Sequence, residues 1–188
     1  MQERLPTYDE ALSLFKEFNK SESLLKHAYA VEGVMRYLAR KMGEDEGKWG
    51  IVGLIHDLDY ESFPEQHCKK SQEILEERGW PEEYIRAVVS HGWGICSDSE
   101  PQTSMEKVLY AIDELTGLIT ALAIVRPSKS VADLEVKSVM KKWKDKSFAA
   151  GVNRSVIEEG TAMLEVELRD LITDVIMGMR EVADRIGL

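Results

Sequence analysis

Apolar residues recur at helical spacing along this chain, and this periodicity limits the fold more than any other feature of the sequence. Side chains three and four positions apart lie on one face of a helix, so an apolar stripe of this kind predicts a helix with one buried side. No stretch combines strand-like alternation with hairpin turn signals. The sequence therefore predicts an all-α fold. The clearest stripe consists of Leu24, Ala28, Val31, Val34, Met35 and Leu38.

Helix-start signals support the same interpretation. A Ser, Thr or Asn followed three residues later by Glu can form a capping box, in which two side chains satisfy free amides of the first turn. Pro64 and Pro81 stand where a first helical position is expected. The candidate capping boxes are Thr7–Glu10, Asn19–Glu22, Thr103–Glu106 and Ser155–Glu158. The predicted helices are residues 7–18, 20–41, 45–57, 64–78, 81–91, 104–125, 130–143, 154–163 and 166–186.

No linker, repeat or low-complexity tract divides the 188 residues, so we expect one domain over residues 1–188. Residues 20–125 would form its functional core, and residues 126–188 would add further helices to it. The last predicted helix has an apolar face that would pack on the domain or form a homodimer contact.

Charge and composition exclude some classes of partner. The chain has 24 basic and 34 acidic residues and a formal charge of −10, which disfavours nucleic-acid polymers and anionic membranes. Its first residues do not resemble a signal peptide, and its longest apolar run, Leu118 to Val125, is too short to span a bilayer. We expect a cytoplasmic protein in which Cys68 and Cys96 are free thiols.

Polar residues in apolar segments indicate a metal site. His56 and Asp57 end the apolar segment IVGLIHDLDY, and His27 lies close to the apolar stripe of its helix. Asp113 lies within VLYAIDELTGLI, where a buried carboxylate needs a cation or hydrogen-bond donors. A divalent metal accepts both imidazole and carboxylate ligands. These four residues are therefore predicted to bind one metal ion.

His67 and His91, the two remaining histidines, would bind a second metal, with Asp57 as the bridging carboxylate. The ions could be Mn, Fe, Mg, Ni, Co or Zn, and one or two could be bound. Asp57 and Asp59 are the candidate catalytic acids. Asp59 and Glu61 could orient a histidine or accept a proton, or they could cap a helix or face solvent.

Basic residues beside His67 could bind the substrate. Lys69 and Lys70 are the candidates, because lysine commonly binds phosphate.

The order of these residues resembles the HD-domain superfamily of metal-dependent phosphohydrolases, in its dinuclear branch. The signature reads His27, His56-Asp57, His67, His91 and Asp113, and the resemblance covers about residues 20–125. The motif here is HDLD rather than HDIG, and neither a His-His pair nor a G-Y-P motif occurs. These departures disfavour the cyclic-dinucleotide phosphodiesterases of that superfamily.

The resemblance implies a helical bundle that hydrolyses a small phosphorylated metabolite or nucleotide with a metal-activated water. Two alternatives stay open. The same ligand pattern resembles the diiron oxygenases of this fold, which cleave C–C or C–P bonds, and a non-catalytic metal-binding or ligand-binding module would need no reaction at all.

Overall fold

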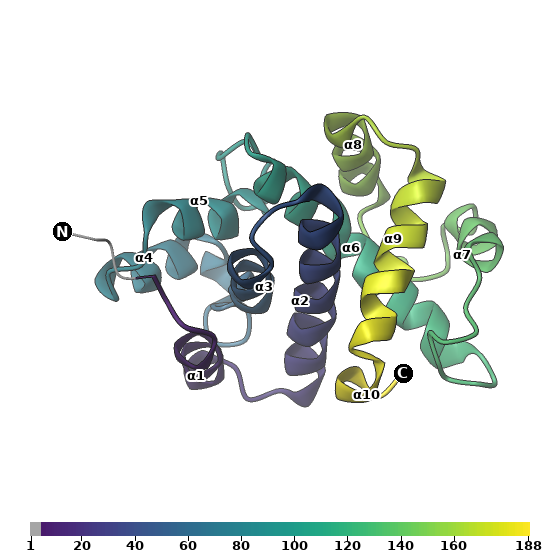
Figure 1. Ribbon diagram of the computed structural model, residues 1–188, viewed down its shortest axis with the longest axis horizontal. Coiled ribbons are helices and arrows are strands. Elements are labelled where there is room, and N and C mark those ends of the chain that lie inside the picture. Colours follow the sequence, from purple (N-terminus) through teal and green to yellow (C-terminus); the bar gives the residue numbers. More distant parts are fainter. Residues whose placement is uncertain (1–4) are drawn as a thin grey trace.

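The computed structural model describes residues 5–188, and all regular secondary structure in that part of the chain is helical (Figure 1). The predicted all-α fold is confirmed. The elements are α1 (Tyr8–Phe18), α2 (Glu22–Met42), α3 (Glu46–Ile55), the 3-10 turn η1 (Pro64–Gln66), α4 (Lys69–Glu77), α5 (Glu82–Ser90), α6 (Ser104–Val125), α7 (Val136–Trp143), α8 (Arg154–Leu164), α9 (Leu168–Glu181) and α10 (Ala183–Ile186).

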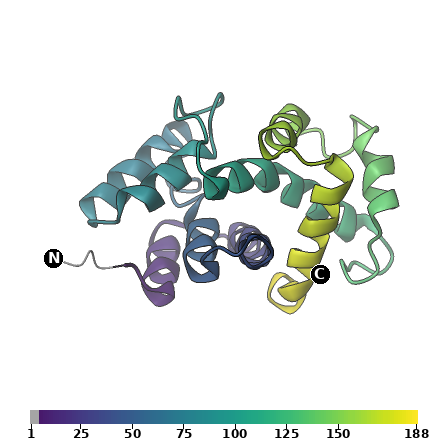
Figure 2. The ribbon, with the colours of Figure 1, turned by 45° about the horizontal axis from the view of Figure 1, so that its top comes forward.

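The two longest helices, α2 and α6, form the centre of the molecule. α3 and α9 pack on opposite sides of α2 (Figure 1). Figure 2 shows α6 extending past α8 toward α7, and α8 packs along it. α2 contacts α3 and α6, and α5 also contacts α3 and α6, so polar side chains on these helices can meet inside the bundle.

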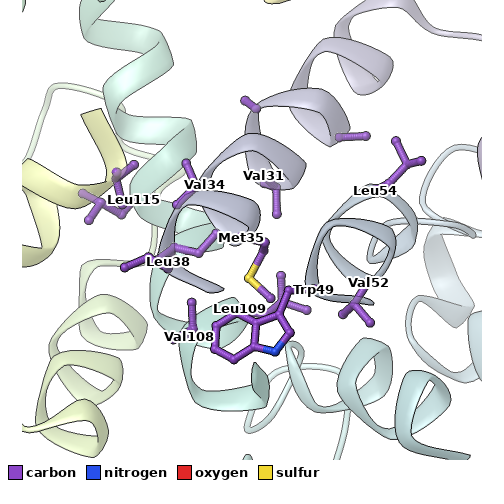
Figure 3. Close-up of a cluster of buried hydrophobic side chains, with 14 of the residues drawn as sticks. Val31, Val34, Met35, Leu38, Trp49, Val52, Leu54, Val108, Leu109 and Leu115 are labelled. Carbon is purple, nitrogen blue, oxygen red and sulfur yellow. The ribbon is translucent and has the colours of Figure 1, made fainter. Parts of the chain in front are cut away.

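The core between α2, α3 and α6 is filled by large apolar side chains (Figure 3). Met35 and Leu109 are completely buried, and Trp49 is 3% exposed. Full burial of such a side chain contributes about 1.5–3 kcal/mol. This packing fixes the relative positions of three of the helices that carry the candidate ligands.

The C-terminal helices pack directly against the ligand-bearing helices. A Cβ at Gly178 of α9 would lie 2.6 Å from the Cα of Val34 on α2. A Cβ at Gly160 of α8 would lie 2.5 Å from the Cα of Ala111 on α6. Backbones approach this closely only where a side chain is missing, so residues 126–188 brace α2 and α6.

Three predicted helices are interrupted or shortened. The helix predicted at 64–78 is divided into η1 and α4, with Cys68 at a φ of 67° between them. A positive φ is rare for a residue with a Cβ, and it stops the helix. The predicted 130–143 helix begins only at Val136, and the predicted 166–186 helix breaks at Val182 between α9 and α10.

The helix-start predictions are confirmed for α1 and α6, where Thr7 and Thr103 form complete capping boxes. They are wrong for α2 and α8, which are capped at Ser21 and Asn153. Pro81 is the N-cap of α5 rather than its first residue.

The backbone at the start of α2 is hydrogen-bonded to a carboxylate that is distant in the sequence. Glu61 accepts hydrogen bonds from the backbone amides of Lys20 and Ser21, at 2.7 and 2.9 Å. Asn19 turns inward and donates to the carbonyl of Leu58 at 2.8 Å. Of the roles expected for Glu61, the structure thus gives it that of a helix cap.

α6 is long and apolar enough, by length and composition alone, to cross a membrane. The apolar run from Leu118 to Val125 does not reveal this, because it covers only the last part of the helix. In the folded chain 61% of the apolar window of α6 is buried by other helices. This burial is typical of the central helix of a folded domain.

Candidate metal centre

The six predicted ligands come from separate elements and meet beside one cavity. His27 lies within α2 and Asp113 within α6. His56 and His91 are the C-cap residues of α3 and α5, and His67 ends η1. Helix ends and breaks therefore supply three of the imidazoles, while the long central helices supply one imidazole and one carboxylate.

Asp57 stands between two groups of histidines. Its Oδ2 lies 3.3 Å from His56 Nε2 and 3.8 Å from His27 Nε2. Its Oδ1 lies 3.5 Å from His67 Nε2 and 3.6 Å from His91 Nε2. Each carboxylate oxygen thus faces one pair of imidazoles, which is the arrangement expected of a carboxylate that bridges two cations.

Asp113 completes the first group of ligands. Its Oδ1 lies 2.9 Å from His27 Nε2 and 3.3 Å from His56 Nε2. Ligand atoms of His27, His56 and Asp57 all lie within 4.8 Å of one another. We call His27, His56 and Asp113 the inner half of the site, and His67 and His91 the outer half, with Asp57 shared by both.

Three of the imidazoles are oriented through Nδ1. His56 Nδ1 lies 2.7 Å from the carbonyl of Gly53, His91 Nδ1 contacts the carbonyl of Val88, and His67 Nδ1 lies 2.7 Å from Asp59 Oδ1. An Nδ1–H that donates to such an acceptor leaves the lone pair on Nε2, the nitrogen that faces Asp57. Metal-binding histidines are typically held in this way.

Asp59 lies behind His67 and is fully buried. Its second oxygen accepts the backbone amide of Ser71 at 2.8 Å. Both oxygens are therefore engaged away from the cavity, and the geometry favours the histidine-orienting role among those expected for Asp59. A direct catalytic role for Asp59 stays a prediction.

The site suits a divalent cation, because its buried imidazole and carboxylate groups are not fully paired with one another in the metal-free protein. His56 Nε2 is buried and makes no hydrogen bond of good geometry, although two carboxylates surround it. Burial opposes the charged imidazole, but Asp57 and Asp113 raise the pKa of His56 well above its ordinary value. Burial also opposes ionisation of Asp57, yet His56 holds the pKa of this carboxyl well below its ordinary value. A bound cation would take the place of the proton on His56.

The site opens into a cavity of about 400 Å³. Among the residues that line it are five of the six predicted ligands, all except His56. Lys69 and Lys70 do not line it: Lys69 is exposed, while Lys70 pairs with Glu73 at 2.8 Å and lies over the ring of Phe63. Their role in substrate binding stays a prediction that this geometry does not support.

The cavity also has lining residues that the sequence interpretation missed. The rest of its wall consists of Leu24, Tyr60, Gly92, Ile95, Cys96, Glu114, Gly117, Gly151 and Val156. Glu114 could have been suspected, since it is a second acid beside Asp113 in an apolar segment. Gly151 and Val156 could not, because only the packing of α8 on α6 brings them to the site.

These observations define a helical protein with a histidine–carboxylate centre suited to one or two divalent metals. The family model for the HD domain matches residues 24–118, just over half of the chain. The chain belongs to the HD-domain family, whose members are generally metal-dependent hydrolases. A search of the solved structures gave no match.

Proposed function

We propose that this protein is a phosphohydrolase that releases phosphate from a small phosphorylated substrate, with water as the nucleophile. The most direct support comes from the imidazoles of His56, His67 and His91. Their Nε2 atoms face the two carboxylate oxygens of Asp57, and each Nδ1 atom contacts an oxygen acceptor on the other side of its ring. Divalent metals bound there would polarise the phosphoryl group and lower the pKa of water.

Two side chains of the protein, Asp57 and Glu114, would have separate roles in the reaction. Asp57 faces the imidazoles of both halves, so it would fix the distance between them. Glu114 lines the cavity, and burial raises the pKa of its carboxyl, with the hydrogen bond from the backbone amide of Asn153 opposing this rise and the charge of Asp113 adding to it. A carboxylate with a raised pKa is a better proton acceptor than one with a lowered pKa, so Glu114 would accept the proton of the attacking water.

The cavity wall narrows the class of substrate. Among its described lining residues there is no Lys or Arg, and Glu114 adds a negative charge. Only the metals would then neutralise phosphate, and a second or third phosphate group would meet repulsion. Leu24, Ile95 and Val156 offer apolar contact instead. We therefore expect a phosphomonoester whose remaining part is uncharged, in preference to a polyphosphate.

The test is phosphate release from a panel of phosphomonoesters and nucleoside polyphosphates, under anaerobic conditions, with Mn²⁺, Mg²⁺ or Fe²⁺ supplied in turn. Turnover without oxygen supports the proposal. Product formation that strictly consumes oxygen, with iron as the only active metal, would replace it with an oxygenase.

A variant of Glu114 tests the division of roles. Glu114→Gln should keep its metal content and lose about 10²–10⁴-fold in kcat, the usual contribution of a proton acceptor. Glu158→Gln, on the exposed surface of α8, is the matched control. Unchanged turnover in Glu114→Gln would remove the residue from the reaction.

A further inference from the structure

We propose that Cys68 and Cys96 form an oxidisable pair that closes to a disulfide when the protein meets a peroxide, and that this bond ties together the two segments that carry the outer-half ligands. The chain has only these two cysteines. They are 28 residues apart in the sequence, and each comes from a different segment beside the cavity.

The two sulfur atoms are already close together. Cys68 Sγ lies 2.8 Å from Cys96 Sγ. That is roughly 0.8 Å longer than a disulfide bond, so bond formation needs little movement of the backbone. The left-handed backbone at Cys68, unusual for a residue with a Cβ, occurs at the same position where η1 gives way to α4.

Gly92 makes room for this pair. A Cβ built on Gly92 would collide with the Sγ atoms of both cysteines. The carbonyl of Gly92 also accepts the backbone amides of Ile95 and Cys96, at 3.0 and 2.9 Å, and so holds the loop that carries Cys96. Gly92 directly follows His91, and Cys68 directly follows His67. A bond between the sulfurs would therefore link the residue next to His67 to a loop that is hydrogen-bonded to the residue next to His91.

The two thiols differ in access, which sets the order of the chemistry. Cys96 is partly exposed and lines the cavity, whereas Cys68 is fully buried. The sulfur of Cys96 would attack one oxygen of hydrogen peroxide and break the O–O bond, giving a sulfenic acid and water. The sulfur of Cys68 would then attack the sulfur of Cys96 and release a second water. Together the two thiols lose two electrons and two protons, and the peroxide is reduced to two waters.

The experiment uses the full chain, both metal-free and loaded with Mn²⁺. Protein treated with mild hydrogen peroxide is alkylated, and its intact mass and non-reduced peptides are analysed. We expect a monomer that has lost two hydrogen atoms, a linked peptide containing Cys68 and Cys96, and reversal by a thiol reductant. A disulfide that closes a loop of this length should also raise the Tm of the oxidised protein by roughly 5–10 °C.

Cys96→Ser is the control variant, because it leaves the buried Cys68 in place. It should show neither the mass loss nor the rise in Tm on treatment with peroxide. Full alkylation of both thiols in treated wild-type protein, or a bond formed only between two chains, would overturn the proposal. A Cys68 that resists oxidation in the Mn²⁺-loaded protein but not in the metal-free protein would overturn it too, since the thiol would then be a metal ligand. If the variant does not fold, reversal of the mass loss by a thiol reductant in the wild-type protein still tests the proposal.

Discussion

The inner and outer halves of the metal centre are built from different kinds of structure. His27 and Asp113 lie within the two longest helices, and the buried His56 ends α3 against the main core. His67 lies where a helix is broken, and His91 precedes a loop held by Gly92. The inner half is therefore positioned mainly by the packing of long helices, while the outer half depends more on a helix break, a loop and a few hydrogen bonds. We therefore expect a cation in the inner half to depend on the fold as a whole, and a cation in the outer half to depend more on local contacts that single substitutions can remove.

Asp57 is the residue on which both halves depend, so its loss should have the largest effect. Asp57→Ala removes the carboxylate that faces four imidazoles. We expect it to lose both metals and more than about 100-fold in activity, beyond the usual effect of residues that only support a ligand. Elemental analysis of protein purified without chelators measures the metal content, with Glu158→Gln as the control. Full metal content in Asp57→Ala would contradict the assignment of the site.

Replacing one histidine of each half by alanine should show that the two halves contribute differently to stability. His56→Ala removes the fully buried imidazole that lies between Asp57 and Asp113, which should destabilise the metal-free protein by about 3–5 kcal/mol. His67→Ala removes a partly exposed ring but leaves the buried Asp59 with the hydrogen bond from Ser71 and without its imidazole partner, which should cost about 1–3 kcal/mol. Urea unfolding of the two metal-free variants makes the comparison, and metal analysis should show that His67→Ala keeps one ion. Equal destabilisation would mean that the halves are not built differently.

A substitution behind the ligands should affect the outer half alone. Asp59→Asn keeps the size of the side chain but removes the charge that orients His67. Such supporting residues typically change metal affinity by about 10–100-fold. Titration with Mn²⁺ should show weaker binding of the second ion and unchanged binding of the first. A change in the first ion as well would mean that the two halves share their supporting contacts.

The smallest effect is expected from pH. The pKa of His56 is raised in the folded protein, so its contribution to the stability of the metal-free protein is present below about pH 6.5 and is lost as the pH rises through the folded value. Asp57 has a lowered pKa, so its contribution is present above about pH 4 and is lost as the pH falls. Metal binding needs neutral imidazoles, so metal affinity should rise over the range in which the metal-free protein weakens.

Thermal unfolding between pH 5.5 and 9 tests the pH prediction. The titration of His56 and His67 then compares the inner half with the outer half. The Tm of chelator-treated protein should fall by several degrees toward alkaline pH, and added Mn²⁺ should remove this fall. The pKa of His67 is raised as well, with burial opposing the effect and the hydrogen bond to Asp59 producing it. NMR titration should find His56 to be the later of these two to lose its proton. The reverse order would show that the outer half holds its proton more firmly.

The parts of the structure that the sequence predicted are those where local chemistry decides the outcome. The long helices follow from apolar spacing, and His56, Asp57 and Asp113 could be singled out because polar groups in apolar segments need partners. The break at Cys68 could not be foreseen, because a positive φ at cysteine has no signature in composition. Nor could the closeness of Cys68 to Cys96, since contacts between distant residues depend on tertiary packing.

The basic residues show the same limit. Lys70 lies near His67 in the sequence, but its ammonium group is paired with Glu73 and it does not line the cavity. The cap on α2 that Glu61 provides joins residues about 40 positions apart, which a local pattern cannot reveal. Nearness along the chain is a weak guide to nearness at a site when a helix break comes between the two residues.

The shared position of Asp57 means that two cations, one in each half, would not bind independently. The first ion to bind would set the orientation of the Asp57 carboxylate. Once both ions are bound, they would share its negative charge. The change that the first ion makes to the affinity for the second must then equal the change that the second makes to the affinity for the first. A stepwise metal titration would consequently give two apparent affinities that belong to the pair of sites, and a substitution confined to either half would alter the coupling free energy between them.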